Sequence, residues 1–182
     1  TWNKVLNISE NTGVNNVKMD PCNPDIMYAT SEQRRRTSFT KIGGGPESTV
    51  YKSTDGGENW QRVDGGAKGV SPGAWVPMIA PSHYDAGTAF VVFDDHRRSD
   101  MRPYVYRVDD YGSKWRSLAT PEISGYALSV LQDPVDPNLL FLGTEFGLFI
   151  SVDGGAGWTR FTAGLPTVSV MDMAIQKREN DL

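Results

Sequence analysis

The sequence predicts an all-β fold built from repeated four-stranded antiparallel units, and three observations predict it. One turn signature occurs three times, at residues 53–60, 108–115 and 151–158. Each copy stands between two short strand-like segments, and an Asp-Gly turn between two strands is typical of a β-hairpin. No segment of ten residues carries the i, i+3, i+4, i+7 apolar spacing of an amphipathic helix. A hairpin that recurs along the chain indicates a repeat architecture.

The signature reads Ser-x-Asp-x-Gly-x-x-Trp in the first and third copies, and the second copy has lost only the serine. We expect the aspartate to accept hydrogen bonds from the amides of the turn. The glycine supplies a positive φ without strain, and the tryptophan packs between strands. We interpret these residues as structural rather than catalytic: Ser53, Asp55, Gly57 and Trp60; Asp110, Gly112 and Trp115; Ser151, Asp153, Gly155 and Trp158.

The repeat extends to both sides of the signature, and its units span residues 14–63, 75–118 and 127–161. A unit opens with an apolar strand, a turn rich in Pro and Asp, and a second strand, because Pro and Asp interrupt a ladder and initiate turns. A loop, a third strand, the signature and a fourth strand follow. The expected strands are 14–19, 26–30, 50–51 and 61–63; then 75–80, 88–93, 104–106 and 116–118; then 127–132, 139–144, 148–150 and 159–161. The first two units carry extra residues, which we expect in loops.

Both ends of the chain match parts of further units. Residues 1–6 match the fourth strands, so they are expected to be the last strand of a preceding unit, and residues 170–182 match the start of a following unit. Four-stranded units of this length are blades of a β-propeller, in which radial repetition protects the strand edges. We therefore expect residues 1–182 to be one propeller segment. We favour an arc cut from a larger propeller over the alternative, in which the two terminal fragments share one closing blade. The opening without Met suggests a processed or truncated product.

Composition and charge exclude several classes of protein. The chain has 182 residues, of which 38% are hydrophobic and 22% are charged, and this is typical of a globular domain. The formal net charge is −4, whereas general binding of nucleic acid favours a basic surface, so we expect no nucleic-acid partner. No apolar run reaches the roughly 20 residues of a membrane helix, so we expect no membrane insertion by this segment. Cys22 is the single cysteine, so no internal disulfide can form.

The turn signature resembles the Asp-box, also called the bacterial neuraminidase repeat. Sialidases, oligoxyloglucan-type β-glucanases, the sortilin ectodomain and photosystem II assembly factors carry it. Residues 143–151 and 164–168, together with the run up to residues 178–182, resemble large bacterial sortilin-like propeller proteins that are often labelled glycosyl hydrolase. The resemblance implies a β-propeller fragment of a larger protein. It also implies export to the periplasm, to the cell surface or into the medium.

Two insertions contain most of the candidate ligand residues, because function in a propeller is located in loops, and Glu145 in the third unit is a further candidate. In the first, Arg34, Arg35 and Arg36 could bind a carboxylate or phosphate through their planar guanidinium groups. We favour a solvated run of charge there. The glycine-rich stretch at residues 43–46 lacks a following Lys-Ser/Thr and a helix, so it is not a nucleotide-binding loop.

In the second insertion, Asp94, Asp95 and His96 could ligate a cation or act as acid and base, and Arg97 follows them. Their spacing matches no metal motif, and we favour an ion cluster that is paired within itself. No cofactor is predicted. A glycosidase needs two carboxylates that flank a sugar. The candidates are Asp94, Asp95, Glu145 and Asp172, and no spacing identifies a pair among them.

The favoured function is therefore a non-catalytic propeller scaffold that binds a protein, a peptide or a glycan. Its further partners would be the remaining blades of the parent propeller. The alternative is part of a glycoside hydrolase, xyloglucanase-like or sialidase-like, with a cleft formed across several blades. A third interpretation is an assembly factor for a membrane complex.

Overall fold

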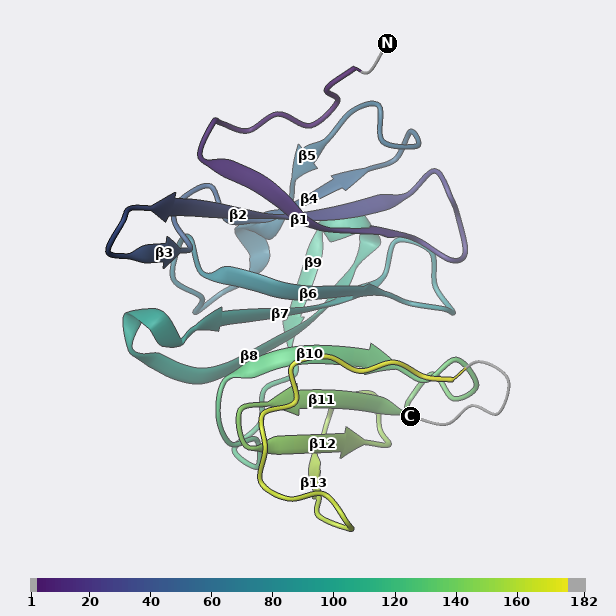
Figure 1. Ribbon diagram of the computed structural model, residues 1–182. Helices are drawn as coiled ribbons and strands as arrows, with labels where there is room; N and C mark the ends of the chain where they lie inside the picture. The colour runs from purple at the N-terminus through teal and green to yellow at the C-terminus, as the bar shows by residue number, and fades with distance from the viewer. Residues whose placement is uncertain (1–2, 177–182) are drawn as a thin grey trace.

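The structure, a computed structural model, describes residues 3–176. Three antiparallel β-sheets follow one another in chain order and stack along one direction (Figure 1). Within the described residues, helical structure is confined to three short 3-10 turns: η1 (Asp64–Gly66), η2 (His96–Arg98) and η3 (Asp110–Gly112). The predicted all-β fold of antiparallel four-stranded units is confirmed.

The first sheet has the strand order β1-β2-β4-β5, and a fifth strand, β3, pairs with β2. The β2 strand pairs with β4 through its first residues and with β3 through residues 34–36. The strands are β1 (Thr12–Met19), β2 (Met27–Arg36), β3 (Lys41–Gly43), β4 (Val50–Ser53) and β5 (Gln61–Arg62).

The second and third sheets have four strands each, in the orders β6-β7-β8-β9 and β10-β11-β12-β13. In each sheet, strands that are consecutive in the chain pair antiparallel, and the turn signature joins the third strand to the fourth. The strands of the second sheet are β6 (Trp75–Pro81), β7 (Ala89–Asp95), β8 (Asp100–Asp109) and β9 (Lys114–Ser117). Those of the third are β10 (Ala127–Gln132), β11 (Leu140–Thr144), β12 (Gly147–Ser151) and β13 (Thr159–Phe161).

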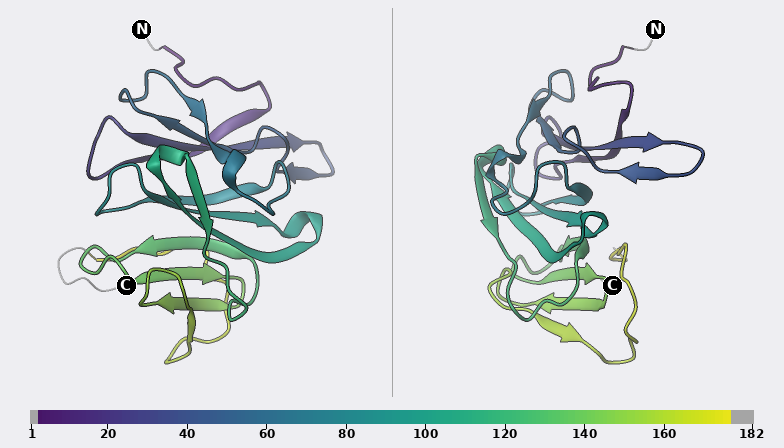
Figure 2. Two further views of the ribbon diagram at one scale, coloured as in Figure 1. Left: turned by 180° about the vertical axis from the view of Figure 1, so that it is seen from behind. Right: turned by 90° about the vertical axis from the view of Figure 1, so that its left-hand side faces the viewer.

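The expectation that the two insertions form loops is wrong in part. The first insertion lengthens β2 as far as Arg36 and turns back through β3, so Arg34, Arg35 and Arg36 lie on a strand. The second lengthens β7 to Asp95 and closes through η2 into β8. Both insertions continue the ladder of their own sheet, because pairing with a neighbouring strand gives their backbone N–H and C=O groups hydrogen-bond partners. The hairpin of β2 and β3 and the η2 turn project from the same side of the molecule (Figure 2).

The core lies between the sheets, in two clusters. One fills the space between the first and second sheets, and the other fills the space between the second and third. Successive residues of β7 alternate between them: Val91 and Phe93 face the first cluster, and Phe90 and Val92 face the second. Because side chains of a strand alternate between its faces, a strand buried on both sides is apolar at nearly every position.

In the first copy of the turn signature, the aspartate binds a turn amide as predicted, and the serine also binds turn amides. Ser53 Oγ donates to Asp55 Oδ1 (2.6 Å) and accepts from the Gly57 N–H (2.9 Å). Asp55 Oδ1 also accepts from the Asn59 N–H (2.9 Å). These bonds stabilise the charged carboxylate, so the bond from Asn59 and then that from Ser53 lower the pKa of Asp55 to about 2.

The third copy forms the same network. Ser151 Oγ donates to Asp153 Oδ1 (2.7 Å) and accepts from the Gly155 N–H (2.8 Å). The Gly157 N–H donates to Asp153 (2.9 Å), and this bond is the first cause of the lowered pKa of that carboxyl. In both copies, side chains of the signature therefore accept hydrogen bonds from backbone amides of their own turn.

The second copy differs. Val108 replaces the serine, and Asp110 and Tyr111 have left-handed φ angles of 53° and 55°. The Asp110 carboxylate pairs with Lys114 (3.5 Å), so its predicted bonds to turn amides are replaced by an exposed ion pair. Trp115 Nε1 still donates to the carbonyl of Gly112 (2.9 Å).

The signature glycine brings the turn close to the preceding sheet. A Cβ at Gly155 would lie 2.9 Å from Leu118 Cδ1, and one at Gly112 would lie 2.9 Å from Val63 Cβ. Trp158 is 4% exposed, and its Nε1 donates to the carbonyl of Leu118 (2.9 Å) at the end of the second sheet. The third turn is therefore fixed to the neighbouring sheet as well as to its own.

The assignment of the two end segments to further blades stays a prediction. Residues 3–8 form no strand, and Thr1 and Trp2 lie outside the described residues. At the other end, the Val170 N–H donates to the carbonyl of Thr144 (2.9 Å), and Ser129 Oγ donates to the carbonyl of Val170 (3.0 Å). This segment lies over the third sheet (Figure 1), and residues 177–182 lie outside the described residues.

We predict that Trp158→Ala lowers the free energy of unfolding by about 3–5 kcal/mol, as truncation of a large core side chain does. Trp60→Ala is the matched control. It should cost clearly less, because Trp60 is only half-buried and its Nε1 bonds within its own turn, to Gly57. Urea denaturation measures both losses. Equal losses, or an unchanged curve for Trp158→Ala, would contradict the assignment.

We also predict that Asp55 contributes to acid lability. Its carboxyl has a lowered pKa in the folded chain, so the stability it supplies is complete above its ordinary pKa near 3.8 and is lost as the pH falls toward about 2. Asp55→Asn should therefore flatten the dependence of the melting temperature on pH between these values. If the melting temperatures of wild type and variant depend on pH in the same way in this window, the hydrogen bonds of Asp55 do not contribute as predicted.

Candidate functional site

The insertions and the connections between sheets meet at one end of the molecule, which we call the insertion face. It contains the β2–β3 hairpin, the η2 turn and the connection from β5 to β6 (residues 63–74). The signature turns lie at the opposite ends of β4, β8 and β12, because each strand runs from the insertion face to its signature turn. Any ligand of the insertions is therefore bound away from the signature turns.

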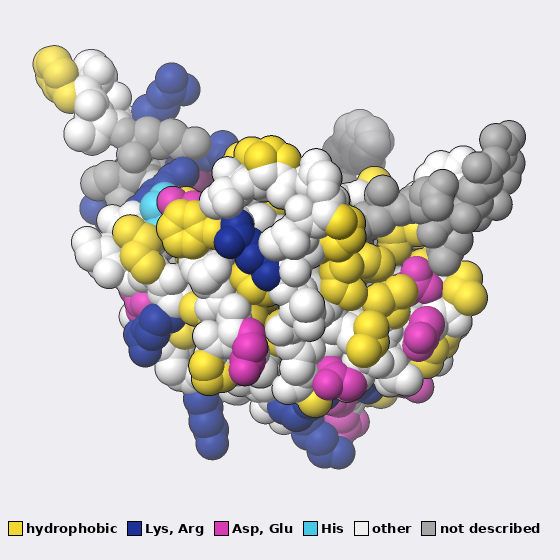
Figure 3. Space-filling model, turned by 90° about the horizontal axis from the view of Figure 1, so that it is seen from below, with side chains coloured by type: hydrophobic (Ala, Val, Ile, Leu, Met, Phe, Trp, Pro, Cys, Tyr) yellow, Lys and Arg dark blue, Asp and Glu magenta, His cyan; other side chains and the backbone are white. Residues whose placement is uncertain are grey.

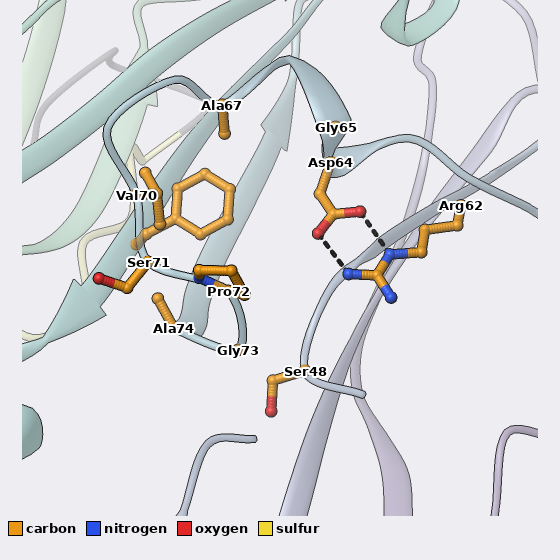
Figure 4. A pocket seen from close by; sticks show the side chains of 11 residues that line it. Ser48, Arg62, Asp64, Gly65, Ala67, Val70, Ser71, Pro72, Gly73 and Ala74 are labelled. Carbon is orange, nitrogen blue, oxygen red and sulfur yellow. Dashed lines mark hydrogen bonds and ion pairs between the residues drawn. The ribbon is translucent and has the colours of Figure 1, made fainter. Parts of the chain in front are cut away.

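A cleft of about 460 Å³ opens on the insertion face between the first two sheets (Figure 4). We call it the inter-blade cleft. Its apolar surface comes from the β5–β6 connection and from one buried ring of β7, and its polar groups come from the first sheet and from the same connection. The apolar residues are Ala67, Val70, Pro72, Ala74 and Phe93; the polar side chains are Ser48, Arg62, Asp64 and Ser71.

An ion pair stands at the rim of the cleft. Arg62 Nε and Nη2 donate to the two carboxylate oxygens of Asp64 at 2.6 and 2.9 Å (Figure 4), a bidentate geometry. Arg62 Nη1 also donates to the carbonyl of Pro46 (3.3 Å). The hydrogen bonds that Arg62 donates to Asp64 raise the pKa of the Arg62 guanidinium. The pair therefore holds a fixed orientation beside an apolar floor.

The wall formed by the β5–β6 connection is held in place by side chains of the second sheet. Tyr104 donates its hydroxyl to the carbonyl of Gly69 (3.0 Å), and Tyr106 donates to the carbonyl of Lys68 (2.6 Å). Arg98, from the η2 turn, donates to the carbonyl of Pro72 (2.9 Å). Three hydrogen bonds from one sheet thus fix this connection, and the cleft is preformed.

The glycine-rich stretch allows two backbones to approach. The Gly45 N–H donates to the carbonyl of Gly73 (2.9 Å), and a Cβ at Gly73 would lie 2.5 Å from the carbonyl oxygen of Gly45. Glycine is required on this contact because no side chain fits there. These residues, excluded as a nucleotide loop by their sequence, connect the first insertion to the wall of the cleft.

The three consecutive arginines do not form one cluster. They lie on β2, where successive side chains point to opposite faces of the sheet. Arg34 pairs with Glu32 (2.6 Å), a carboxylate whose side chain is 5% exposed. Arg35 and Arg36 are exposed. Sequence reasoning missed Glu32, although its spacing of two residues from Arg34 on a strand indicates a shared face.

The charged residues of the second insertion pair with one another. Asp94 accepts from the His96 N–H (2.9 Å) and lies 2.7 Å from His96 Nδ1. Asp95 accepts from Arg98 Nε (2.5 Å). Both carboxylates are buried, and each has a cationic or imidazole partner within its own hairpin. Within residues 3–176, no group of three or more His, Cys, Asp or Glu is arranged to hold a metal ion.

Two aromatic contacts join the second insertion to its surroundings. The His96 ring stacks on Tyr126 with centroids 4.3 Å apart, and Arg97 lies over Trp75 (5.7 Å). Figure 3 shows Lys and Arg side chains beside a histidine at the left, the side from which the insertions project in Figure 1. The Glu145 N–H donates to the carbonyl of Tyr126 (3.2 Å), so the Glu145 backbone lies beside the residue on which His96 stacks.

The structure does not bring the predicted ligand residues into the cleft. Its walls come instead from residues 62–74, a connection that the sequence alone gave no reason to select. The repeat places it between two blades, and its Gly and Pro residues are typical of a loop. Asp172 lies elsewhere, beside a different cavity bounded by β1, β6 and β10. Within the described residues, no helix is long and apolar enough to span a membrane.

No protein-family model and no curated protein matches the sequence. Solved structures do. YCF48 from Cyanidioschyzon merolae is 18% identical, with a TM-score of 0.58 over 86% of this chain and 42% of that chain. A GH74 enzyme from Niastella koreensis is 22% identical, with a TM-score of 0.60 over 87% of this chain and 24% of that chain. A structure of YCF48 bound to D1 peptide is 11% identical, with a TM-score of 0.53 over 82% and 40%.

The chain thus spans less than half of each structure that it matches. These structures are β-propellers, and the predicted β-propeller fold is confirmed. At identities below a quarter, the likeness shows the fold alone.

We predict that Arg98→Ala destabilises the chain by about 1–3 kcal/mol, because it leaves the buried Asp95 carboxylate without its cation. Arg102→Ala is the matched control, since Asp100 is the more exposed acid of the two pairs. Thermal and urea unfolding compare the two variants. An Arg102→Ala loss as large as that of Arg98→Ala would contradict the role given to burial.

Proposed function

We propose that this chain is a non-catalytic segment of a β-propeller that binds a polypeptide, with the inter-blade cleft as its binding site. The observation that carries the proposal is the construction of the cleft. Its floor is apolar, its rim holds one fixed ion pair, and its wall is tied down by Tyr104, Tyr106 and Arg98. A preformed site lowers the ordering cost of binding.

The size and chemistry of the cleft suit part of a peptide. Its volume of about 460 Å³ falls in the range of ordinary ligand pockets. An apolar side chain would pack against Val70 and Phe93. Peptide C=O groups would accept hydrogen bonds at the rim from the guanidinium N–H groups of Arg62.

The arrangement of carboxylates supports binding rather than catalysis. Glycoside hydrolysis uses two carboxyl groups on either side of the sugar. Within the described residues, the cleft is lined by one carboxylate, Asp64, and Arg62 occupies both of its oxygens. The buried acids Glu32, Asp94 and Asp95 are likewise engaged by partners in their own hairpins.

The comparisons support a binding role at the level of the fold. One neighbour, YCF48, has been solved with a D1 peptide. The three signature turns support assignment to the Asp-box repeat, and the resemblance to sortilin-like proteins supports export of the parent protein. These assignments are proposed together with the binding function and rest on the same repeat.

The alternative function is part of a glycoside hydrolase whose cleft crosses several blades. The similarity in fold to a GH74 enzyme favours it. It requires a second carboxyl group in the cleft, which the described residues do not supply. The alternative therefore predicts turnover by the whole parent protein that depends on acids of this chain.

Selection of a displayed random peptide library on the chain tests the proposal. We predict that selected peptides lose measurable affinity for Ala67→Trp, which fills the cleft with a bulky ring. They should bind unchanged to Val135→Trp, which places the same ring at an exposed turn of the third sheet. Calorimetry and thermal melts on both variants separate blocked binding from misfolding.

Two results would count against a peptide site. One is a set of selected peptides that binds Ala67→Trp as well as wild type. The other is hydrolysis of a polysaccharide or an aryl glycoside by the parent protein that is abolished by Asp64→Asn in a folded variant.

A further inference from the structure

A second pocket lies at the other end of the molecule from the inter-blade cleft. It is open, has a volume of about 430 Å³, and lies where the first two signature turns face each other across the sheets. Asn23, Lys52 and Thr54 line it from the first sheet, and Asp110 and Tyr111 line it from the second. We call it the turn-face pocket.

The three signature turns serve as internal controls for one another. Gly56 and Gly154 occupy the position after the aspartate, with φ angles of 69° and 70°. The second turn has Tyr111 at this position, with φ of 55°. A tyrosine pays a conformational penalty in this region that glycine does not. The chain therefore keeps an aromatic ring at a place where its own repeat favours glycine.

In the same turn, the side chain of the aspartate is not hydrogen-bonded within the turn as it is in the other two copies. Asp55 and Asp153 are occupied by the serine hydroxyl and by backbone amides of their turns. Asp110 follows Val108 instead of a serine two positions earlier, and its side chain is half-exposed with one long contact, to Lys114. Its oxygens are therefore available to accept hydrogen bonds from a ligand at the mouth of the pocket.

Charged and polar groups from the facing sheet complete the pocket. Lys52 Nζ lies 5.7 Å from the centroid of the Tyr111 ring, and its ammonium can donate to a bound oxygen. Asn23 adds an amide that both donates and accepts. Deeper between the sheets, the buried Tyr28 hydroxyl has no hydrogen-bond partner among the described residues. Burial, and then the charges of Asp20 and Tyr111, raise the pKa of this hydroxyl.

We propose that the turn-face pocket is a saccharide-binding site. A sugar ring presents a C–H face that packs on an aromatic ring and an edge of hydroxyls that both donate and accept. Tyr111 supplies the ring, Asp110 supplies an acceptor, and Lys52 and Asn23 supply donors. A pocket with few fixed polar groups around one apolar surface is the usual construction of a small-ligand site. This site is independent of the peptide cleft.

The rival explanation is that Tyr111 only packs. Its ring covers Gly87, where a Cβ would lie 2.8 Å from Tyr111 Cδ1, and its N–H donates to the carbonyl of Gly87 (3.0 Å). The backbone bond needs no side chain, and the first and third turns fold with glycine. Replacement of Tyr111 by glycine therefore distinguishes packing from binding.

The test is a titration of the chain with neutral disaccharides and oligosaccharides of glucose, galactose, mannose and xylose at millimolar concentration, followed by NMR. We expect at least one sugar to shift the amides of residues 110–113 and 52–54. Tyr111→Gly should weaken its binding by about tenfold or more, as loss of one stacking contact does, while the melting temperature stays equal or rises. Asp110→Asn should also weaken it.

Val152→Ala, in the exposed part of the third turn, is the matched control and should bind the sugar as wild type does. The proposal is overturned if no sugar shifts these amides. It is also overturned if Tyr111→Gly binds as tightly as wild type, or if this variant melts well below wild type, because the ring would then be structural. Binding of peptides at the inter-blade cleft is unaffected by any of these outcomes.

Discussion

Burial of the second sheet on both of its faces is the constraint on which the rest of the structure depends. The strand β7 sends Val91 toward the first sheet and Val92 toward the third, and both are fully buried. Apolar surface removed from water supplies most of the free energy of folding, and here it is removed only when the sheets stack. We therefore expect the stacked sheets to fold together and an isolated sheet not to be stable.

Stacking also requires that the ends of the sheets approach closely. The glycine of the signature turn meets the residue that follows the fourth strand of the sheet before it, Val63 in one case and Leu118 in the other. Trp158 adds a hydrogen bond to the same Leu118. The signature is thus a device for joining neighbouring sheets as well as for closing a hairpin.

Outside the apolar clusters, the insertions and the β5–β6 connection form the surface of the insertion face. The inter-blade cleft forms because the β5–β6 connection is held against the second sheet by Tyr104 and Tyr106 instead of closing on the first. Buried acids of the insertions are neutralised locally, as Asp95 is by Arg98. A buried charge without a partner would cost more than the hairpin gains. The insertion face therefore combines charges that are paired locally with the apolar opening of the inter-blade cleft.

The repeat also makes departures from the pattern informative. A lost serine and an added tyrosine in the second turn can be judged against two copies that fold under the same constraints. Strain at Tyr111 has meaning because Gly56 and Gly154 show what the turn favours. An isolated turn would not offer this comparison.

The sequence by itself determined the strands, their order within each unit and the place of each signature turn, because these depend on local chemistry. Alternation of side chains, Pro and Asp at turns, and Gly at a positive φ all act within a few residues. It also indicated that residues such as Asp55 and Trp158 are structural. The course of the insertions was predicted wrongly, since loop-like composition at residues 31–49 does not reveal that β2 and β3 can pair.

Only the tertiary structure decided which groups meet. Arg34, Arg35 and Arg36 are adjacent in sequence and separate in space, because a strand alternates its faces. Ser48, Arg62 and Phe93 are distant in sequence and share one cleft. Lys52 of the first sheet and Tyr111 of the second are likewise brought together by the stacking of the two sheets. Contacts between sheets depend on how the sheets stack, and the spacing of residues along the chain carries no measure of that distance.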